Sequence, residues 1–488
     1  MPDILPLLLK LQPILTKTNC RQLYQIVMAM LVMPANITQR SIARWADKGA
    51  SYRSVHRFFQ TNIDWTQIQW LLFLLVLHVA TDTYLLVGDE TVLKKAGKST
   101  FGLDRFFSSL AQKPVPAVAF FALALVNVQK RQAYTLSVQQ VVRTQEEKDS
   151  AKKKREERKN KTCKTQDQNA KSGRPKGSKN KNKEQVTLNP ELERIFLWTQ
   201  KLLALIGKKI PLHYFVLDGH FGNHPAYSMT RRLGLHLLSK MRHNAKLYLL
   251  PTEAQAQASP RLKYGERLDY DNLPLTSRVS CEQEGDYECE VYQMQCRHKD
   301  FADVLNIVIL VKTHRVTKRR GHVILLCSDL ELAALTMIDY YSLRFQIEFE
   351  FRDAKQHFGL SDFVCVNQAS VQNAVGLSFF LGNLSRHLLD GLQESFPQAG
   401  VIDLKSYYRG RRYASETLKC LPSALKSFPD FADGIVCTRL LQQMEVVLDR
   451  VCRLGLIHPE GEVASCRSSV SRSVSKMEFP TGDLLLTT

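Results

Sequence analysis

Residues 84–91, Tyr-Leu-Leu-Val-Gly-Asp-Glu-Thr, form the stretch that decides the fold. A run of apolar residues followed by glycine is typical of a buried strand, and this one ends at Asp89. A second such run, Tyr214 to Leu217, ends at Asp218. Carboxylates at the ends of neighbouring strands are held rigidly at one edge of a sheet, so we expect the two aspartates to lie together. Either aspartate alone would more often cap a turn.

The pattern around these two runs alternates between strand and helix. Hydrophobic periodicity predicts further strands at 116–128, 133–142 and 235–241. It also predicts helices at 192–206 and 227–233. The resulting order, strand-strand-strand-helix-strand-helix-strand, predicts a mixed α/β sheet rather than a β-sandwich.

Residues 246–332 return to a β pattern and predict an insertion. Strands are expected at 304–311 and 323–326, joined by a basic turn at 317–321. We expect these strands to form a small sheet of their own. A long helix is expected next, from about Leu332 to His357, with further helices to about residue 455.

The charge of the chain indicates a polyanionic partner. Its 488 residues include 67 Lys and Arg against 47 Asp and Glu, a formal net charge of +20, and nucleic acid is the commonest partner of such proteins. The most apolar run, residues 68–80, is too short to span a bilayer, and we expect neither a secretion signal nor a membrane anchor. The eleven cysteines include no Cys-x-x-Cys pair. Reduced thiols and a cytoplasmic, nucleoid-associated location are therefore expected.

Two short helices near the N-terminus are candidates for DNA binding. The patterns of 37–45 and 52–59 are helical and flank a glycine turn. On the second helix Arg53, His56 and Arg57 share one face, as in a helix-turn-helix that binds DNA. Two helices that merely pack together are the alternative interpretation.

A basic segment at 148–186 has no hydrophobic periodicity, which predicts a solvated, disordered loop. It contains Gly-Arg-Pro-Lys-Gly at 173–177, in which Arg174 and Lys176 resemble the core of an AT-hook that enters the minor groove of A·T-rich DNA. The residue before this core is Ser172, where an arginine is usual. A generic basic linker that contacts phosphates is an equally good interpretation.

The long helix carries a polar stripe. Tyr341, Arg344, Glu348 and Lys355 have offsets of 0, 3, 7 and 14 residues, which place them within one sector roughly 60° wide at about 100° per residue. Apolar residues such as Phe345 surround the stripe. An acid between two bases on a helix packed against a sheet is costly without a partner, and a metal ion with a phosphate backbone would satisfy all of them.

Two further acids on this helix lie off the stripe. We interpret Glu350 and Asp353 as charges that face solvent.

The spacing Tyr-x2-Arg-x3-Glu-x6-Lys of these four residues resembles the signature of DDE-class insertion-sequence transposases. The Asp-x-Thr that begins at Asp89 is similar to the first motif of that family, and the resemblance covers about residues 84–385. It implies a ribonuclease H-like core with a β-rich insertion and helical N-terminal and C-terminal regions. It also implies that Asp89, Asp218 and Glu348 are the catalytic, metal-binding residues.

The resemblance implies a specific chemistry. Asp89, Asp218 and Glu348 would hold two Mg²⁺ ions, for which Mn²⁺ could substitute, because these hard cations prefer carboxylate oxygens. Tyr341, Arg344 and Lys355 would hold DNA phosphates near the cut. The partners implied are element ends and target DNA, with a homodimer pairing two ends in one complex.

With the resemblance in hand, the chain divides into five expected regions. They are a helical DNA-binding region (1–80), the first part of the core (81–245), the insertion (246–332), the second part of the core with the catalytic helix (333–400), and a helical C-terminal region with a mobile tail (401–488). Two alternatives to a transposase stay open, namely a ribonuclease H-like nuclease that only cleaves and a non-catalytic DNA-binding protein. An intact acidic triad disfavours the second, and the insertion with its candidate DNA-binding segments disfavours the first.

Overall fold

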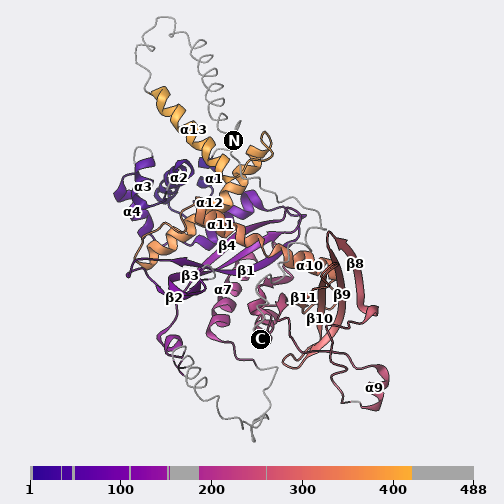
Figure 1. The fold of residues 1–488 in the computed structure, drawn as a ribbon. Coiled ribbons are helices and arrows are strands. Elements are labelled where there is room, and N and C mark those ends of the chain that lie inside the picture. The colour runs from indigo at the N-terminus through magenta and orange to yellow at the C-terminus, as the bar shows by residue number, and fades with distance from the viewer. Residues whose placement is uncertain are drawn as a thin grey trace, which may run out of the picture.

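A single mixed β-sheet of eleven strands organises the part of the chain that the structure describes (Figure 1). The structure is a computed structural model. It describes residues 4–419 apart from positions 35, 47–49, 109–110, 151–152, 154–155, 157–185 and 260. The predicted minor-groove residues Arg174 and Lys176, and the expected C-terminal tail, lie outside the described residues.

The core of the sheet has the mixed order predicted from the sequence. β1 lies between an antiparallel neighbour, β3, and a parallel neighbour, β5, which in turn pairs in parallel with β6. β4 and the short β2 both pair with β3. These strands are β1 (Tyr84–Lys94), β2 (Asp104–Ser108), β3 (Lys113–Asn127), β4 (Gln132–Val141), β5 (Tyr214–Leu217) and β6 (His236–Met241). The predicted α/β class is confirmed, and the arrangement is consistent with a ribonuclease H-like fold.

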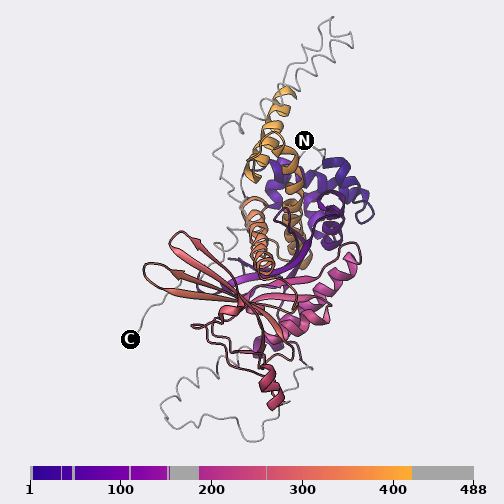
Figure 2. The same ribbon diagram turned by 90° about the vertical axis from the view of Figure 1, so that its right-hand side faces the viewer.

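The insertion does not form a separate sheet, and that expectation was wrong. Its last strand, β11, pairs antiparallel with β6, so the same sheet continues outward (Figure 2). The reason is that β6 would otherwise leave a row of unpaired N–H and C=O groups at an edge. The added strands are β7 (Leu247–Leu249), β8 (Arg278–Glu284), β9 (Tyr287–His298), β10 (Leu305–His314) and β11 (Arg320–Cys327).

Helices cover both faces of the sheet, and alternate strand residues enter two different cores. Leu85 and Val87 pack on the face covered by the N-terminal helices, α11 (Gln346–His357) and α12 (Gln368–Gln393). Leu86 packs on the face covered by α7 and α8. Side chains alternate along a strand, so Asp89 belongs to the first face and Glu90 to the second. The elements on the α7 side are α7 (Pro190–Ile206), a 3₁₀ turn η2 (Gly219–Phe221) and α8 (His224–Arg232). The outlying α9 spans Glu253–Ala258, and a second 3₁₀ turn, η3, spans Leu275–Ser277.

The N-terminal helices include the predicted pair, α3 and α4. Thr38 and Ser51 cap the two helices through their side-chain oxygens. The region is fixed to α12 by Asn373, whose amide donates to the carbonyl of Phe59 at 2.9 Å and accepts from Trp65 Nε1 at 2.8 Å. The helices are α1 (Ile4–Leu9), α2 (Lys17–Val32), α3 (Gln39–Trp45), α4 (Tyr52–Gln60), α5 (Trp65–Leu72) and the π-helical turn η1 (Phe73–Leu77).

The expected helix at 332–357 is broken in two, which corrects the sequence prediction. α10 (Ala334–Leu343) and α11 (Gln346–His357) are separated by Arg344 and Phe345. At the junction the backbone tightens to i→i+3 hydrogen bonds, from Arg344 N–H to Tyr341 O and from Ile347 N–H to Arg344 O, each 3.2 Å. α12 (Gln368–Gln393) and α13 (Val401–Lys419) follow. None of the helices in the described part of the chain is long and apolar enough to cross a membrane.

Candidate active site

Asp89 and Asp218 occupy adjacent positions on neighbouring parallel strands. The last pair in register between β1 and β5 is Gly88 with Leu217, and each aspartate is the next residue along the chain. β5 ends there, but β1 continues to Lys94 because β3 still pairs with it, so Asp89 lies within a strand rather than after one. The two carboxylates therefore lie at the point in the sheet where β1 and β5 stop pairing.

The Asp89 carboxylate is in an environment that disfavours its charge. Its side chain is 19% exposed, and Oδ2 accepts a hydrogen bond from Arg344 Nη1 at 2.9 Å. Burial raises the pKa of Asp89 to about 6; Arg344 opposes this shift, whereas the charges of Asp218 and Glu348 add to it. Three carboxylates thus repel one another across a small space.

A tight turn holds Asp218. Its side chain accepts from His220 N–H at 3.2 Å, and its carbonyl oxygen accepts from Ser239 Oγ at 2.7 Å. Gly222, further along the turn, packs against the Lys240 carbonyl so closely that a β-carbon would clash with it. Backbone and side chain together fix the turn to β6.

Glu348 and Arg344 come from the junction of α10 and α11. Arg344 Nη2 donates to Glu348 Oε1 at 3.0 Å, while the other nitrogen bonds Asp89. The arginine is 16% exposed and also interacts electrostatically with Asp218. Burial disfavours its charge, but the surrounding anions outweigh burial and raise its pKa. One guanidinium therefore lies among all three predicted catalytic carboxylates.

The other two stripe residues reach the same place. Tyr341 is hydrogen-bonded to Arg344, and burial raises its pKa to about 12. Burial lowers the pKa of Lys355, and attraction to Asp89 opposes that shift. The structure thus brings Tyr341, Arg344, Glu348 and Lys355 to the two aspartates despite the break between α10 and α11.

Lys240 is a nearby basic residue that the sequence prediction missed. It lies on β6, and its pKa is lowered by burial and by the positive charge of Arg344. A lone lysine in the apolar strand 235–241 was the available signal.

Glu350 and Asp353 do not face solvent, and that interpretation was wrong. They are 1% and 3% exposed, and both accept hydrogen bonds from Arg386 of α12, at 3.2 Å and 3.0 Å. Once α12 covers this side of α11, its buried acids need an opposite charge. The arginine that supplies it is 33 residues beyond Asp353, too far away for helical periodicity to reveal.

Glu90, the immediate neighbour of Asp89, points to the opposite face of the sheet. Burial first, and Glu191 second, raise the pKa of Glu90 to about 7. Glu191 also pairs with His220 at 3.4 Å. Glu90 therefore belongs to a separate polar group on the α7 side.

The fit of a divalent cation to the site depends on its donor atoms and on Arg344. Asp89, Asp218 and Glu348 offer the hard oxygens that Mg²⁺ prefers, and the mutual repulsion at Asp89 would be relieved by a cation. Across the described residues, however, no three acidic, histidine or cysteine side chains are grouped closely enough to hold a metal. Arg344 separates two of the carboxylates. The three carboxylates fit a divalent cation by their chemistry, and in this structure Arg344 occupies the position between Asp89 and Glu348.

The predicted DNA-binding face of α4 is exposed. Arg53, His56 and Arg57 all face solvent, and His56 Nδ1 lies 3.0 Å from Gln39 Oε1 of α3. The described residues between 36 and 60 include four arginines and no acid. This surface is therefore suited to a polyanion.

Comparison with known proteins places the chain in a family and agrees with the fold. A family described as DDE superfamily endonuclease matches residues 10–299, more than half of the 488 residues. The chain belongs to this family, whose members are nucleases that act on DNA and generally use divalent metals. The match includes Asp89 and Asp218 and ends before Glu348. No curated protein matches the chain.

Proposed function

We propose that the protein is a transposase of the insertion-sequence type, which cleaves DNA at element ends and joins the freed strand to target DNA. The observation that carries this proposal is the convergence of Asp89, Asp218 and Glu348 around Arg344. The Tyr-Arg-Glu-Lys spacing adds support, because all four of its residues reach that site.

In this proposal Asp89, Asp218 and Glu348 would hold two Mg²⁺ ions, or Mn²⁺ in their place. Such cations supply charge stabilisation at the attacking and leaving oxygens of an in-line displacement at phosphorus. The carboxylates must be ionised to bind them, so Asp89 has to lose its proton.

The basic residues of the site position the DNA. Arg344 is already oriented by two carboxylates and can exchange them for a phosphate, which its planar group binds in a bidentate manner. Lys355 and Lys240 place two more positive charges beside it, and Tyr341 offers a hydroxyl. Together they hold the strand in register for attack.

DNA outside the cleavage site would bind to other basic segments. Arg53 and Arg57 of α4 are exposed on one surface, and the segment with Arg174 and Lys176 adds further charge. By the family resemblance, two copies of the chain would pair two element ends.

The test is incubation of the full chain with candidate element-end duplexes, a target plasmid and Mg²⁺. Wild type should release cut ends and join them to the plasmid, and Asp218→Ala should do neither. The control is Glu331→Ala, which removes an exposed acid from the loop before α10 and should leave both reactions intact. Cut ends without joined products would reduce the assignment to a nuclease that only cleaves.

A further inference from the structure

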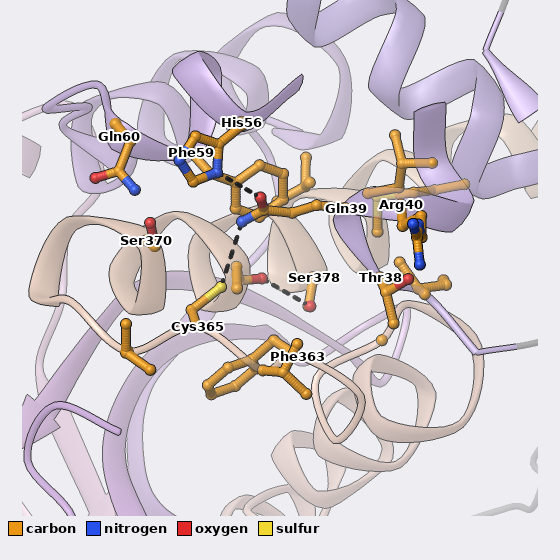
Figure 3. A pocket seen from close by; sticks show the side chains of 18 of the residues that line it. Thr38, Gln39, Arg40, His56, Phe59, Gln60, Phe363, Cys365, Ser370 and Ser378 are labelled. Carbon is orange, nitrogen blue, oxygen red and sulfur yellow. Dashed lines mark hydrogen bonds between the residues drawn. The ribbon is translucent and has the colours of Figure 1, made fainter. Parts of the chain in front are cut away.

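A pocket of about 400 Å³ lies between the N-terminal helices and the catalytic core (Figure 3). α3 and α4 form one side of the pocket. The loop that follows α11, at 358–367, and the start of α12 form the other. None of the candidate catalytic residues lines it.

The walls are apolar and include aromatic rings from both sides. Phe59 of α4 and Phe363 of the loop lie on opposite sides of the cavity and are 4% and 5% exposed (Figure 3). Ile42, Ala374 and Leu377 contribute further apolar surface. Such walls suit a flat, weakly hydrated ring.

One buried polar group in the pocket lacks a hydrogen-bond partner. Ser370 is 2% exposed, and its Oγ has no hydrogen-bond partner among the described residues. Gln60 lies near it in Figure 3, and its Oε1 accepts from Asn367. Arg40 lines the opposite end and forms no ion pair with any acid that the structure describes. A buried hydroxyl left unpaired is costly, so the pocket is better suited to a ligand with hydrogen-bonding edges than to a hydrocarbon.

The surroundings of the pocket are positive. Arg44, Arg53 and Arg57 are exposed on the same two helices as the pocket lining. An anionic ligand would therefore be favoured over a neutral one.

We propose that this pocket binds one nucleotide, with the base between the aromatic walls and the phosphate at Arg40. The base edge meets Ser370 Oγ and the Gln60 amide. An acyl chain or an apolar side chain of another protein would leave the Ser370 hydroxyl unpaired and would not use the arginine.

The pocket is connected to the candidate active site through β1. Lys95, just past the end of that strand, donates to the carbonyls of Ser361 and Phe363 at 3.2 Å and 2.8 Å. Its Nζ also lies 3.5 Å from the centre of the Phe363 ring. Lys95 is six positions beyond Asp89, roughly 20 Å along an extended strand. An unpaired nucleotide of a DNA strand bound at the candidate active site could therefore reach the pocket. A free nucleotide has the same chemistry, and the experiment must separate the two sources.

The experiment measures base burial with the fluorescent base 2-aminopurine and the full-length protein in EDTA. One duplex carries a single unpaired 2-aminopurine, and a second duplex carries it paired. Acrylamide quenching reports whether the protein shields the base. The monophosphate of the 2-aminopurine nucleoside tests whether the pocket binds a free nucleotide. EDTA prevents cleavage, so this result is separate from the proposed transposase activity, although the DNA arm rests on that proposed function.

Two pairs of variants locate the binding. Arg40→Gln should weaken binding of the unpaired nucleotide roughly tenfold, and Ser370→Ala roughly three- to tenfold, with loss of shielding in both. Arg44→Gln also removes one positive charge, but one turn along α3 and outside the pocket lining. It should weaken binding of both duplexes equally, without loss of shielding. Thr199→Val removes another buried hydroxyl that lacks a partner, on the far face of the sheet, and should change nothing.

Shielding of the unpaired base, lost in Arg40→Gln and Ser370→Ala, supports a DNA nucleotide in the pocket. If only the free nucleotide binds, and Arg40→Gln and Ser370→Ala weaken that binding, the pocket binds a free nucleotide rather than a nucleotide of DNA. The proposal is overturned if neither binds, or if shielding persists in both pocket variants.

Discussion

Arg344 Nη1 lies 2.9 Å from Asp89 Oδ2, which joins the break between α10 and α11 to the middle of β1. The same side chain reaches Glu348 at 3.0 Å. Arg344 therefore neutralises part of the charge that a divalent cation would neutralise. Under the proposed function, DNA phosphates would attract the guanidinium away from the carboxylates and leave them available to a cation. We therefore expect metal binding to be coupled to DNA binding.

The first prediction concerns Arg344→Gln. Without DNA this variant should bind Mn²⁺ roughly tenfold more tightly than wild type, because the competing positive charge is gone. Strand cleavage should nevertheless fall, since a phosphate contact is lost. Mn²⁺ binding can be followed by electron paramagnetic resonance, with Arg352→Gln, an exposed arginine on α11, as the control. Equal or weaker Mn²⁺ binding by Arg344→Gln would contradict the coupling.

A second prediction follows from the raised pKa of Asp89, about 6 against the usual 3.8. The metal-binding form is the ionised one, so binding is complete above pH 6 and is lost as the pH falls through that value. Below pH 6 the apparent Mn²⁺ affinity should fall by about tenfold per pH unit for one proton. Calorimetry between pH 5 and 7.5 measures this dependence. Asp89→Asn should bind weakly with a flatter profile; a wild-type profile that is flat down to pH 5 would argue against Asp89 as a ligand.

The third prediction concerns the buried group under the catalytic helix. Arg386→Met leaves Glu350 and Asp353 without their partner and should cost about 3–5 kcal/mol of unfolding free energy. Adding Glu350→Gln and Asp353→Asn should restore much of the loss, because no buried charge then remains. Chemical denaturation measures both variants. Arg352→Met, which removes a 48% exposed partner of Asp353, should cost no more than about 1 kcal/mol.

A fourth prediction compares two glycines in the Asp218 turn. Gly222→Ala should destabilise the protein by about 1–3 kcal/mol, because its β-carbon would overlap the Lys240 carbonyl and displace the turn. Gly219→Ala should be tolerated, since the nearest atom to its β-carbon is 3.5 Å away. Thermal unfolding and cleavage assays on both variants check this difference. Equal effects would show that the close approach does not position Asp218.

Local patterns predicted seven of the strands, β1, β3, β4, β5, β6, β10 and β11, because their side chains alternate between two apolar cores. They did not predict β2, β7, β8 or β9. The run from Tyr214 to Leu217 is a strand with the bounds expected, and Asp218 follows it. The same patterns could not predict contacts between residues far apart in the sequence. Periodicity cannot show that β11 pairs with β6, nor that Arg386 lies against Glu350.

The polar stripe of the catalytic helix shows the same limit. Its spacing assumed an unbroken helix, whereas the backbone tightens at Arg344. The four side chains still converge, because a tight turn of two residues changes their direction only in part. The spacing therefore identified residues that lie near Asp89, although it assumed one unbroken helix and the structure has two.

The central claim is that Asp89, Asp218 and Glu348 form one catalytic site. Its most direct test is cleavage of an element-end duplex in Mg²⁺ by the three single alanine variants, with DNA binding measured in parallel. We predict that each variant binds DNA as wild type does and retains less than about a thousandth of its cleavage rate. The control is Glu331→Ala, which removes an exposed acid and should leave cleavage unchanged. Glu350 is unsuitable as a control, because its side chain is buried against Arg386. Substantial cleavage by any one of the three variants would contradict the assignment.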